Sequence, residues 1–393
     1  MTTTKNNIPV GYKDSAVGII PQEWEVKRVK DIGKVVTGST PPTTDASNYG
    51  NEYMFVSPAD LSDRQKYIYC TEKMLSSKGY NKSRKIPKGA VLYTCIGSTI
   101  GKIGIAPCEL SSNQQINAVI CKNDNEYLYY VLLYRTGQIR MLAGEQAVPI
   151  INKSDFENIK LAVPPLAEQK KIAEILGVWD EAIEKQNLLI EKLELRKRAL
   201  MQRLLTGKTR LHGFTEPWQK VKLGEISTIK KGVQVNKNTL QEYGKYPTIN
   251  GGIDPSGYSD NYNTEANTIT ISEGGNSCGY VNFITTKFWS GGHCYTITPL
   301  NNIKNLYLYH QLKYFEPRIM IQRVGSGLPN IQFNMLIKFE CFLPTLLEQT
   351  AIAEVLNTAD KEIAIHIKTL DALRLQKRGL MQQLLTGKTR VKI

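Results

Sequence analysis

The sequence predicts an α+β protein, with two similar mixed α/β domains separated by two long helices that form an antiparallel coiled coil with an internal pseudo-two-fold repeat. Residues 164–211 return as residues 344–391 at a constant offset of 180 positions. Both copies have the spacing of a long amphipathic helix, and the segments before them are similar but more diverged. The expected order is a domain at 1–163, a helix at 164–211, a domain at 212–343 and a helix at 344–393.

Each long helix carries a heptad seam, because apolar residues recur at alternating spacings of four and three. Polar residues interrupt the seam at the same places in both copies, Gln186 and Lys197 in the first and His366 and Lys377 in the second. Each helix would be roughly 60 Å long, and we expect the two to pack as a strut between the domains. The apolar seam residues are Ile172, Leu176, Ile183, Ile190, Leu193, Leu200, Ile352, Leu356, Ile363, Leu370, Leu373 and Leu380.

The repeated heptamer LLTGKTR at the end of each helix does not match a phosphate-binding loop. Such a loop needs a glycine five residues before the Gly-Lys pair and a strand leading into it. Gln202 and Gln382 stand at that place, and a helix leads in. Gly207 and Gly387 are therefore predicted to be left-handed C-terminal caps, while prolines mark both helix starts.

The two segments before the helices are diverged copies of one mixed α/β fold. Trp24 matches Trp218 at an offset of 194, whereas Gly101 matches Gly279 at an offset of 178. The difference places 16 additional, lysine-rich residues in the first domain between about Val56 and Tyr93. Short apolar runs predict strands, and residues 125–143 and 305–324 predict one helix each.

Composition indicates a polyanionic partner. The 393 residues carry a formal net charge of +14, and each of the four segments is net positive. The seven cysteines, an odd number without a C-x-x-C pair, suggest reduced core thiols. No apolar run is long enough to span a membrane, and the first residues lack a signal-peptide core. We therefore expect a cytoplasmic protein without membrane contact.

Patterns that carry catalysis are missing. The sequence has no Asn or Asp followed by Pro-Pro and an aromatic residue, and no glycine-rich cofactor turn after a strand. The four histidines are scattered rather than spaced as metal ligands, and no nucleophile elbow occurs. The chain is predicted to be non-catalytic, without a metal or cofactor of its own, although an irregular nuclease site stays open.

Polar loops supply the candidates for nucleic-acid binding. Amide side chains in SSNQQINA and KKGVQVNK can pair with adenine edges in the major groove, and lysines and arginines can contact phosphates. The candidate residues are Lys82, Arg84, Lys85, Lys102, Asn113, Gln114, Gln115, Lys230, Lys231, Gln234, Asn276, His293, Arg323 and Asn330.

Over essentially its whole length the chain resembles the specificity subunits of type I restriction-modification enzymes. The resemblance lies in the helix starts LAEQKKIAEIL and LLEQTAIAEVL, the helix ends RKRALMQRLLTGKTRL and QKRGLMQQLLTGKTRV, and the strand pattern GAVLYTCIGSTIGKIGI. It implies two target-recognition domains that each read one half of a split, asymmetric sequence in double-stranded DNA. It also implies that the helices set the gap and recruit two modification (methyltransferase) subunits, which are joined by restriction/translocase subunits. S-adenosylmethionine, ATP and Mg would bind those partners.

We place the partner-binding surface on the outer faces of both helices, near Gln169, Glu174, Gln349 and Glu354. Two alternatives stay open. The chain could be the specificity module of a DNA methylation system that lacks a translocating nuclease, or a non-catalytic adaptor that binds acidic proteins.

Overall fold

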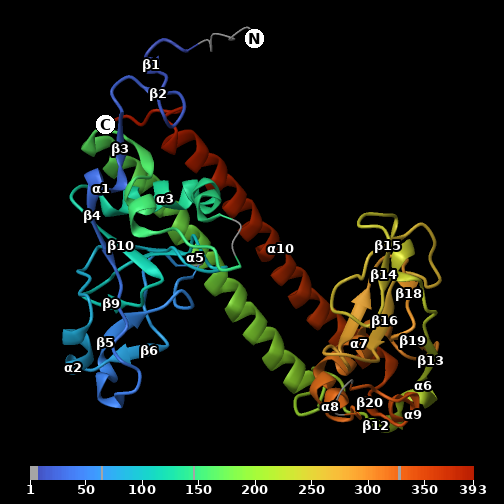
Figure 1. Ribbon diagram of the computed structural model, residues 1–393. Coiled ribbons are helices and arrows are strands. Elements are labelled where there is room, and N and C mark those ends of the chain that lie inside the picture. Colours follow the sequence, from blue (N-terminus) through green and yellow to red (C-terminus); the bar gives the residue numbers. More distant parts are fainter. Residues whose placement is uncertain (1–7, 63–64, 145–146, 326–328) are drawn as a thin grey trace. The chain divides into compact units, whose positions relative to one another are not determined.

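The computed structural model describes residues 8–62, 65–144, 147–325 and 329–393. It divides into unit 1, Met1–Leu188 with Lys368–Ile393, and unit 2, Leu189–Ile367 (Figure 1). Each unit holds one sheet domain, the start of one long helix and the end of the other. Each compact unit therefore combines one of the expected domains with parts of both helices. Within the described ranges, no helix is long and apolar enough to cross a membrane.

The two units contain the same four-stranded antiparallel sheet. In unit 1 the strand order is β4 (Gly33–Thr37), β10 (Ile116–Cys121), β7 (Val91–Thr94) and β8 (Ile103–Ile105). In unit 2 it is β13 (Ser227–Lys231), β19 (Cys294–Pro299), β16 (Thr268–Ser272) and β17 (Val281–Ile284). Asn117 pairs with Thr37, and Tyr295 pairs with Lys231. The two sequence offsets are therefore confirmed by strand register.

A small antiparallel pair joins the beginning and end of each domain. It consists of β3 (Glu25–Arg28) with β11 (Lys160–Val163) in unit 1, and β12 (Gln219–Lys222) with β20 (Glu340–Leu343) in unit 2. Further short elements are β1 (Tyr12–Lys13), β2 (Ile20–Pro21), α1 (Val29–Ile32), η2 (Met141–Ala143), α4 (Lys153–Glu157), α6 (Leu223–Ile226) and α9 (Phe333–Ile337).

One helical segment packs on each main sheet. In unit 1 it is α3 (Asn125–Arg140), which buries Tyr127, Leu128 and Tyr130. In unit 2 the segment is broken into α7 (Asn305–Tyr314) and α8 (Glu316–Ile321). The prediction of one helix over 305–324 is therefore wrong. The break precedes Pro317, whose ring nitrogen has no N–H to continue the α7 hydrogen-bond ladder.

Each unit has a second, smaller sheet of three strands, and the additional residues of the first domain lie beside it. Unit 1 pairs β6 (Lys73–Leu75), β5 (Tyr49–Val56) and β9 (Ser111–Ser112), with η1 (Ala46–Asn48) before β5 and α2 (Ser77–Lys82) after β6. Unit 2 has β15 (Tyr258–Ser259), β14 (Tyr246–Ile249), β18 (Trp289–Ser290) and η3 (Lys237–Thr239). The Tyr53 and Tyr80 rings stack with centroids 4.0 Å apart, which anchors α2 to β5.

Both predicted long helices are present as continuous elements (Figure 1), α5 (Leu166–Leu204) and α10 (Leu346–Leu385). They pair antiparallel inside each unit. In unit 1, Ile172 near the start of α5 shares a core with Leu384 near the end of α10. In unit 2, Leu204 shares a core with Ile352. None of the twelve predicted apolar seam side chains is exposed.

The structure confirms the predicted glycine caps of the long helices but only part of the prediction about the cysteines. Gly207 and Gly387 have φ values of +69° and +72°, as a left-handed cap requires. All seven cysteines are free, but Cys70 and Cys108 are exposed, so the expectation of core thiols is wrong for these two.

Candidate nucleic-acid interface

In unit 1, three polar loops meet where β4 and β7 end and β10 begins. The Cys95 N–H donates to the Gln115 carbonyl at 2.8 Å, and the Ile151 N–H donates to the Cys95 carbonyl at 2.8 Å. The Gly38 N–H donates to the Ile116 carbonyl at 2.9 Å. These backbone bonds hold the loops after β4 and β7 against the loop that contains Asn113, Gln114 and Gln115.

Unit 2 repeats this backbone arrangement. The Glu273 N–H donates to the His293 carbonyl at 2.9 Å, and the Ile331 N–H donates to the Glu273 carbonyl at 2.8 Å. The Gly232 N–H donates to the Cys294 carbonyl at 2.8 Å. The ends of β13 and β16 and the start of β19 therefore present loops on the same scaffold as in unit 1.

A glycine allows the closest approach of these loops in each unit. A Cβ atom on Gly38 would lie 2.1 Å from the Asn113 carbonyl oxygen, and one on Gly232 would lie 2.2 Å from the Gly291 carbonyl oxygen. Because backbone atoms cannot rotate away as a side chain can, only glycine fits at either position.

The side chains on the unit 1 scaffold form a neutral cluster. The Thr37 hydroxyl donates to Asn117 Oδ1 at 2.7 Å, and Asn117 Nδ2 lies 3.2 Å from Cys95 Sγ. Burial raises the pKa of the Cys95 thiol to about 12, so it stays protonated at neutral pH. Gln114 is exposed, and its Oε1 accepts a hydrogen bond from the Thr40 hydroxyl at 2.7 Å.

The corresponding side chains in unit 2 surround a carboxylate. Glu273 accepts from Lys231 Nζ at 2.6 Å and from the Tyr295 hydroxyl at 2.8 Å, and its Oε2 lies 3.5 Å from His293 Nδ1. Burial raises the pKa of Glu273, but the hydrogen bonds from Lys231 and Tyr295 outweigh it and the pKa lies below its ordinary value. Glu273 is therefore ionised and held beneath two exposed basic side chains.

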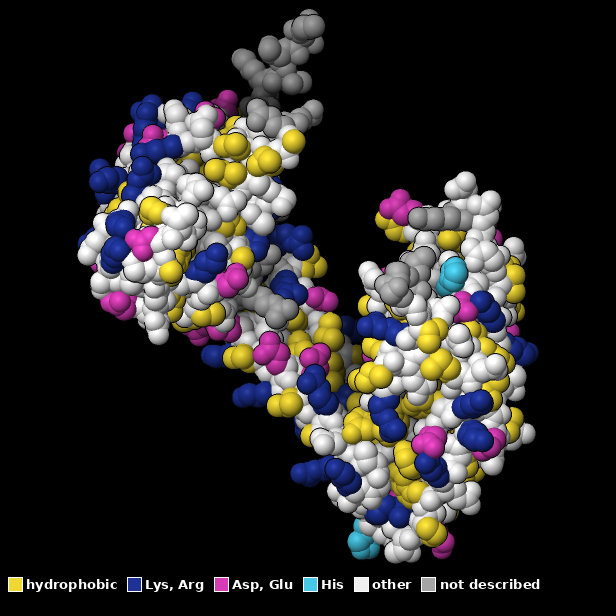
Figure 2. Space-filling model, turned by 60° about the horizontal axis from the view of Figure 1, so that its bottom comes forward, with side chains coloured by type: hydrophobic (Ala, Val, Ile, Leu, Met, Phe, Trp, Pro, Cys, Tyr) yellow, Lys and Arg dark blue, Asp and Glu magenta, His cyan; other side chains and the backbone are white. Residues whose placement is uncertain are grey.

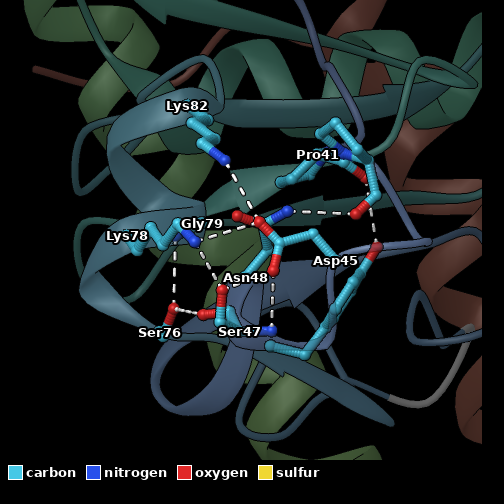
Figure 3. A network of polar contacts seen from close by, with 10 residues as sticks. Pro41, Asp45, Ser47, Asn48, Ser76, Lys78, Gly79 and Lys82 are labelled. Carbon is cyan, nitrogen blue, oxygen red and sulfur yellow. Dashed lines mark hydrogen bonds and ion pairs between the residues drawn. The ribbon is translucent and has the colours of Figure 1, made fainter.

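The other candidates of the first domain lie on or near its additional residues. Arg84 connects these residues to the end of β4, because its Nη1 donates a hydrogen bond to the Thr37 carbonyl at 2.9 Å. Lys82 ends α2 and lies 3.4 Å from Asp45, which also pairs with Lys78 at 3.0 Å (Figure 3). Lys85 lies 5.0 Å from the Tyr80 ring centroid, and half-buried Lys102 donates to the Pro58 carbonyl at 3.1 Å.

The remaining candidates of the second domain lie on β13 or on the loops at the unit 2 strand end. All are exposed. Lys230 belongs to β13, Gln234 follows that strand, and Asn276 lies between β16 and β17. Arg323 precedes the bridge between Val324 and Asn330, and Asn330 also bridges to Gly274. Both units therefore gather predicted candidates at equivalent sheet ends.

Sequence reasoning missed the two carboxylates that organise these lysines, Glu273 and Asp45. Glu273 follows a predicted strand at the position that corresponds to Cys95 at the offset of 178. That correspondence was the available signal, but residue type alone favours basic and amide side chains as DNA contacts and passes over a carboxylate.

Lysine and arginine side chains are scattered over the visible surfaces of both units (Figure 2). This distribution agrees with the net positive charge of every segment. Among the described residues, no three His, Cys, Asp or Glu side chains form a group that could hold a metal ion.

The predicted partner surface at the helix starts needs a correction. Gln169 and Gln349 are only 3% and 2% exposed, and their amides donate to the Pro164 and Pro344 carbonyls at 2.8 and 3.0 Å. These amides hydrogen-bond backbone carbonyls at the helix starts from the buried side. Their assignment to an exposed partner surface is therefore wrong. Glu174 and Glu354 are exposed.

The fold thus consists of two domains that repeat one sheet and one set of loop clusters. Residues 21–195 and 215–375 match the model of the type I restriction modification DNA specificity domain, and the chain belongs to this family. It is 25% identical to the type I restriction enzyme MjaIX specificity subunit of Methanocaldococcus jannaschii, over 97% of this chain and 96% of that protein. It is 27% identical to the MjaVIII specificity subunit of the same organism, over 95% and 94%.

Among solved structures, the fold is similar to that of the type I restriction-modification S subunit from M. genitalium. The TM-score is 0.64 at 20% identity, and the match covers 92% of this chain and 96% of that chain.

Proposed function

We propose that this chain selects the DNA sequence on which a type I restriction-modification complex acts. Each unit would read one half of a bipartite, asymmetric target in double-stranded DNA. The observation that carries this proposal is that candidate base-reading residues of both domains lie at equivalent sheet ends on the same backbone scaffold. The side chains on that scaffold differ between the units, which favours two different half-sites.

Recognition would combine two kinds of contact. Lysine and arginine side chains neutralise phosphates and release counterions, which gives an affinity that falls steeply with salt. Amide groups such as those of Gln114 and Asn113 offer a donor and an acceptor together, which suits the N6 and N7 edge of adenine. Phosphate contacts would fix the register of the protein on the duplex, and base contacts would select the sequence.

The two long helices would fix the gap between the half-sites and recruit the partners. Pseudo-two-fold repetition gives two equivalent outer helix faces, one with Glu174 and one with Glu354, which suits two modification subunits. Restriction/translocase subunits would join that assembly. We assign methyl transfer from S-adenosylmethionine and the ATP- and Mg-dependent steps to these partners, and propose that this chain itself is non-catalytic.

A band-shift titration with duplex DNA tests the proposal against the adaptor alternative. The assay uses the full chain in complex with its modification subunit at several salt concentrations. A DNA reader should bind duplex DNA with an affinity that falls linearly with salt on a log–log plot. The absence of a shift at low salt, with an assembled complex, would contradict DNA recognition.

A pull-down with this chain as bait tests the other alternative. Capture of the modification subunit without any restriction subunit would favour a methylation system that lacks a translocating nuclease.

A further inference from the structure

The two units place chemically different side chains at four positions that are equivalent in backbone register. Strand pairing matches Thr37 with Asn117 and Lys231 with Tyr295. The backbone bonds from Cys95 to Gln115 and from Glu273 to His293 match as well. We call these sets the strand-end clusters: Thr37, Cys95, Gln115 and Asn117 in unit 1, and Lys231, Glu273, His293 and Tyr295 in unit 2.

The unit 2 strand-end cluster has a buried layer and an exposed layer. The Glu273 side chain is 12% exposed, whereas the side chains of Lys231 and His293 are 53% and 60% exposed. The Glu273 carboxylate is thus too deeply buried to be the main contact with DNA. It lies 2.6 Å from the Lys231 ammonium group. In unit 1 the corresponding layer is the thiol of Cys95, which carries no charge.

We propose that the strand-end clusters read the two half-sites, and that Glu273 is a positioning residue that orients Lys231 and His293 toward base edges. This inference rests on the proposed function. A free lysine side chain loses considerable rotamer entropy when it is fixed on a base, and an anchoring carboxylate reduces that loss on binding. Donors at these positions suit the N7 and O6 acceptors of guanine, whereas the Gln115 amide of unit 1 suits adenine.

The sign of the charge separates this role from general attraction to DNA. A carboxylate near the duplex repels phosphates, so removing its charge should not weaken non-specific binding. If Glu273 orients Lys231 and His293, removing the charge should still weaken discrimination between sequences. Affinity for random DNA and discrimination should therefore respond differently to one substitution.

The test is selection of binding sequences from a random duplex library by the full chain in complex with its modification subunit. E273Q should lower sequence preference in one half-site by about tenfold, while preference in the other half-site and affinity for random DNA do not fall. Q115A should lower preference in the other half-site. E265Q is the matched control, because Glu265 pairs with Lys287 at 3.2 Å before β16 begins, whereas Glu273 follows its end. It should leave both preferences unchanged.

The possible outcomes separate a failure of the proposed function from a failure of the role given to the strand-end clusters. A wild-type complex without any bipartite preference contradicts the proposed function. A bipartite wild-type preference that E273Q leaves unchanged, or lowers equally in both half-sites, overturns only the role of the strand-end clusters. H293A is a second variant that removes only an exposed side chain. It should reduce preference in the same half-site as E273Q, and an unchanged preference there would also overturn the inference.

Discussion

Arg390 binds the buried carboxylate of Glu168, 222 residues earlier in the chain. Its Nε and Nη2 lie 2.8 and 3.0 Å from the two carboxylate oxygens, and the indole of Trp24 donates to the same carboxylate at 2.9 Å. Arg210 makes the same pair of bonds to Glu348, at 2.6 and 2.7 Å. Both carboxylates are fully buried. Each unit thus fixes the end of one long helix to the start of the other with the same ion pair.

Replacing Arg390 by alanine should destabilise unit 1 by about 3 kcal/mol, because it leaves the Glu168 carboxylate buried without its cation. R210A should do the same in unit 2. Thermal and urea unfolding of the full chain measure the effect. R378A removes an exposed arginine from α10 and is the control. A loss in R390A no larger than in R378A would contradict the role of the ion pair.

The two units differ at one buried position next to the helices. In unit 1 the Tyr130 hydroxyl donates to Asp180, which also pairs with Lys377. In unit 2 the corresponding residue is His310, which is 1% exposed, and neither ring nitrogen has a hydrogen-bond partner. H310Y should let a hydroxyl reach Asp360 and stabilise unit 2 by about 1 kcal/mol at neutral pH. A destabilised H310Y in thermal unfolding would show that the pocket does not accept the tyrosine.

Because His310 is buried, the stability of unit 2 should depend on pH. The pKa of His310 is lowered from 6.5 to about 4, mainly by burial, against an opposing effect of the Asp360 carboxylate and with a smaller lowering effect of Lys197. The unfolded chain therefore binds a proton near pH 6.5 that the folded chain takes up only near pH 4, so stability falls as pH falls through this window. Between pH 7 and pH 5 the loss from this group should be about 2 kcal/mol. Urea unfolding at both pH values should show a smaller loss in H310Y, and equal losses would exclude His310 as the cause.

Gly38 and Gly232 should not tolerate alanine. The added methyl group would meet a carbonyl oxygen at 2.1 or 2.2 Å, so G38A and G232A should each cost more than about 2 kcal/mol and disturb the adjacent strand-end cluster. Gly379 is the control, because nothing lies within 4 Å of its Cβ position in α10 and Ala199 stands at the equivalent position of α5. G379A should stabilise the helix by about 0.5–1 kcal/mol. Thermal unfolding of the three variants gives the comparison, and similar values for all three would contradict the close approach.

Charge reversal at Glu174 and Glu354 should weaken capture of the modification subunit while the fold stays intact. Both side chains are exposed, so the substitutions should not affect the cores. E194K, another exposed position on α5, is the control for the charge change. Pull-down of the modification subunit measures the effect. Unchanged capture by the E174K/E354K double variant would remove these faces from the partner surface.

The sequence predicted the long helices, their seam and the repeated sheet because these depend on periodicity and register, which sequence spacing records directly. It assigned Gln169 and Gln349 to the wrong face. Each lies three residues before a seam residue, Ile172 or Ile352, so helical geometry already placed it on the buried side. The polar residue type suggested an exposed surface, whereas the amide satisfies a buried helix start.

Two features of the candidate site depend on contacts between distant segments. Glu273 and Lys231 are 42 residues apart and meet only because β13 and β16 both pair with β19. Asp45 and Lys82 are 37 residues apart and meet across η1 and α2. Single-residue patterns locate the basic side chains, but the carboxylates that hold them emerge only from the folded arrangement.

Recognition of a split target by two domains can be measured by mapping methylated bases across a genome with long-read sequencing, after co-expression of this chain with its modification subunit. We expect a two-part, asymmetric motif whose halves are separated by a fixed number of unspecified base pairs. A continuous motif, or no motif from a demonstrably assembled complex, would contradict recognition by two independent domains.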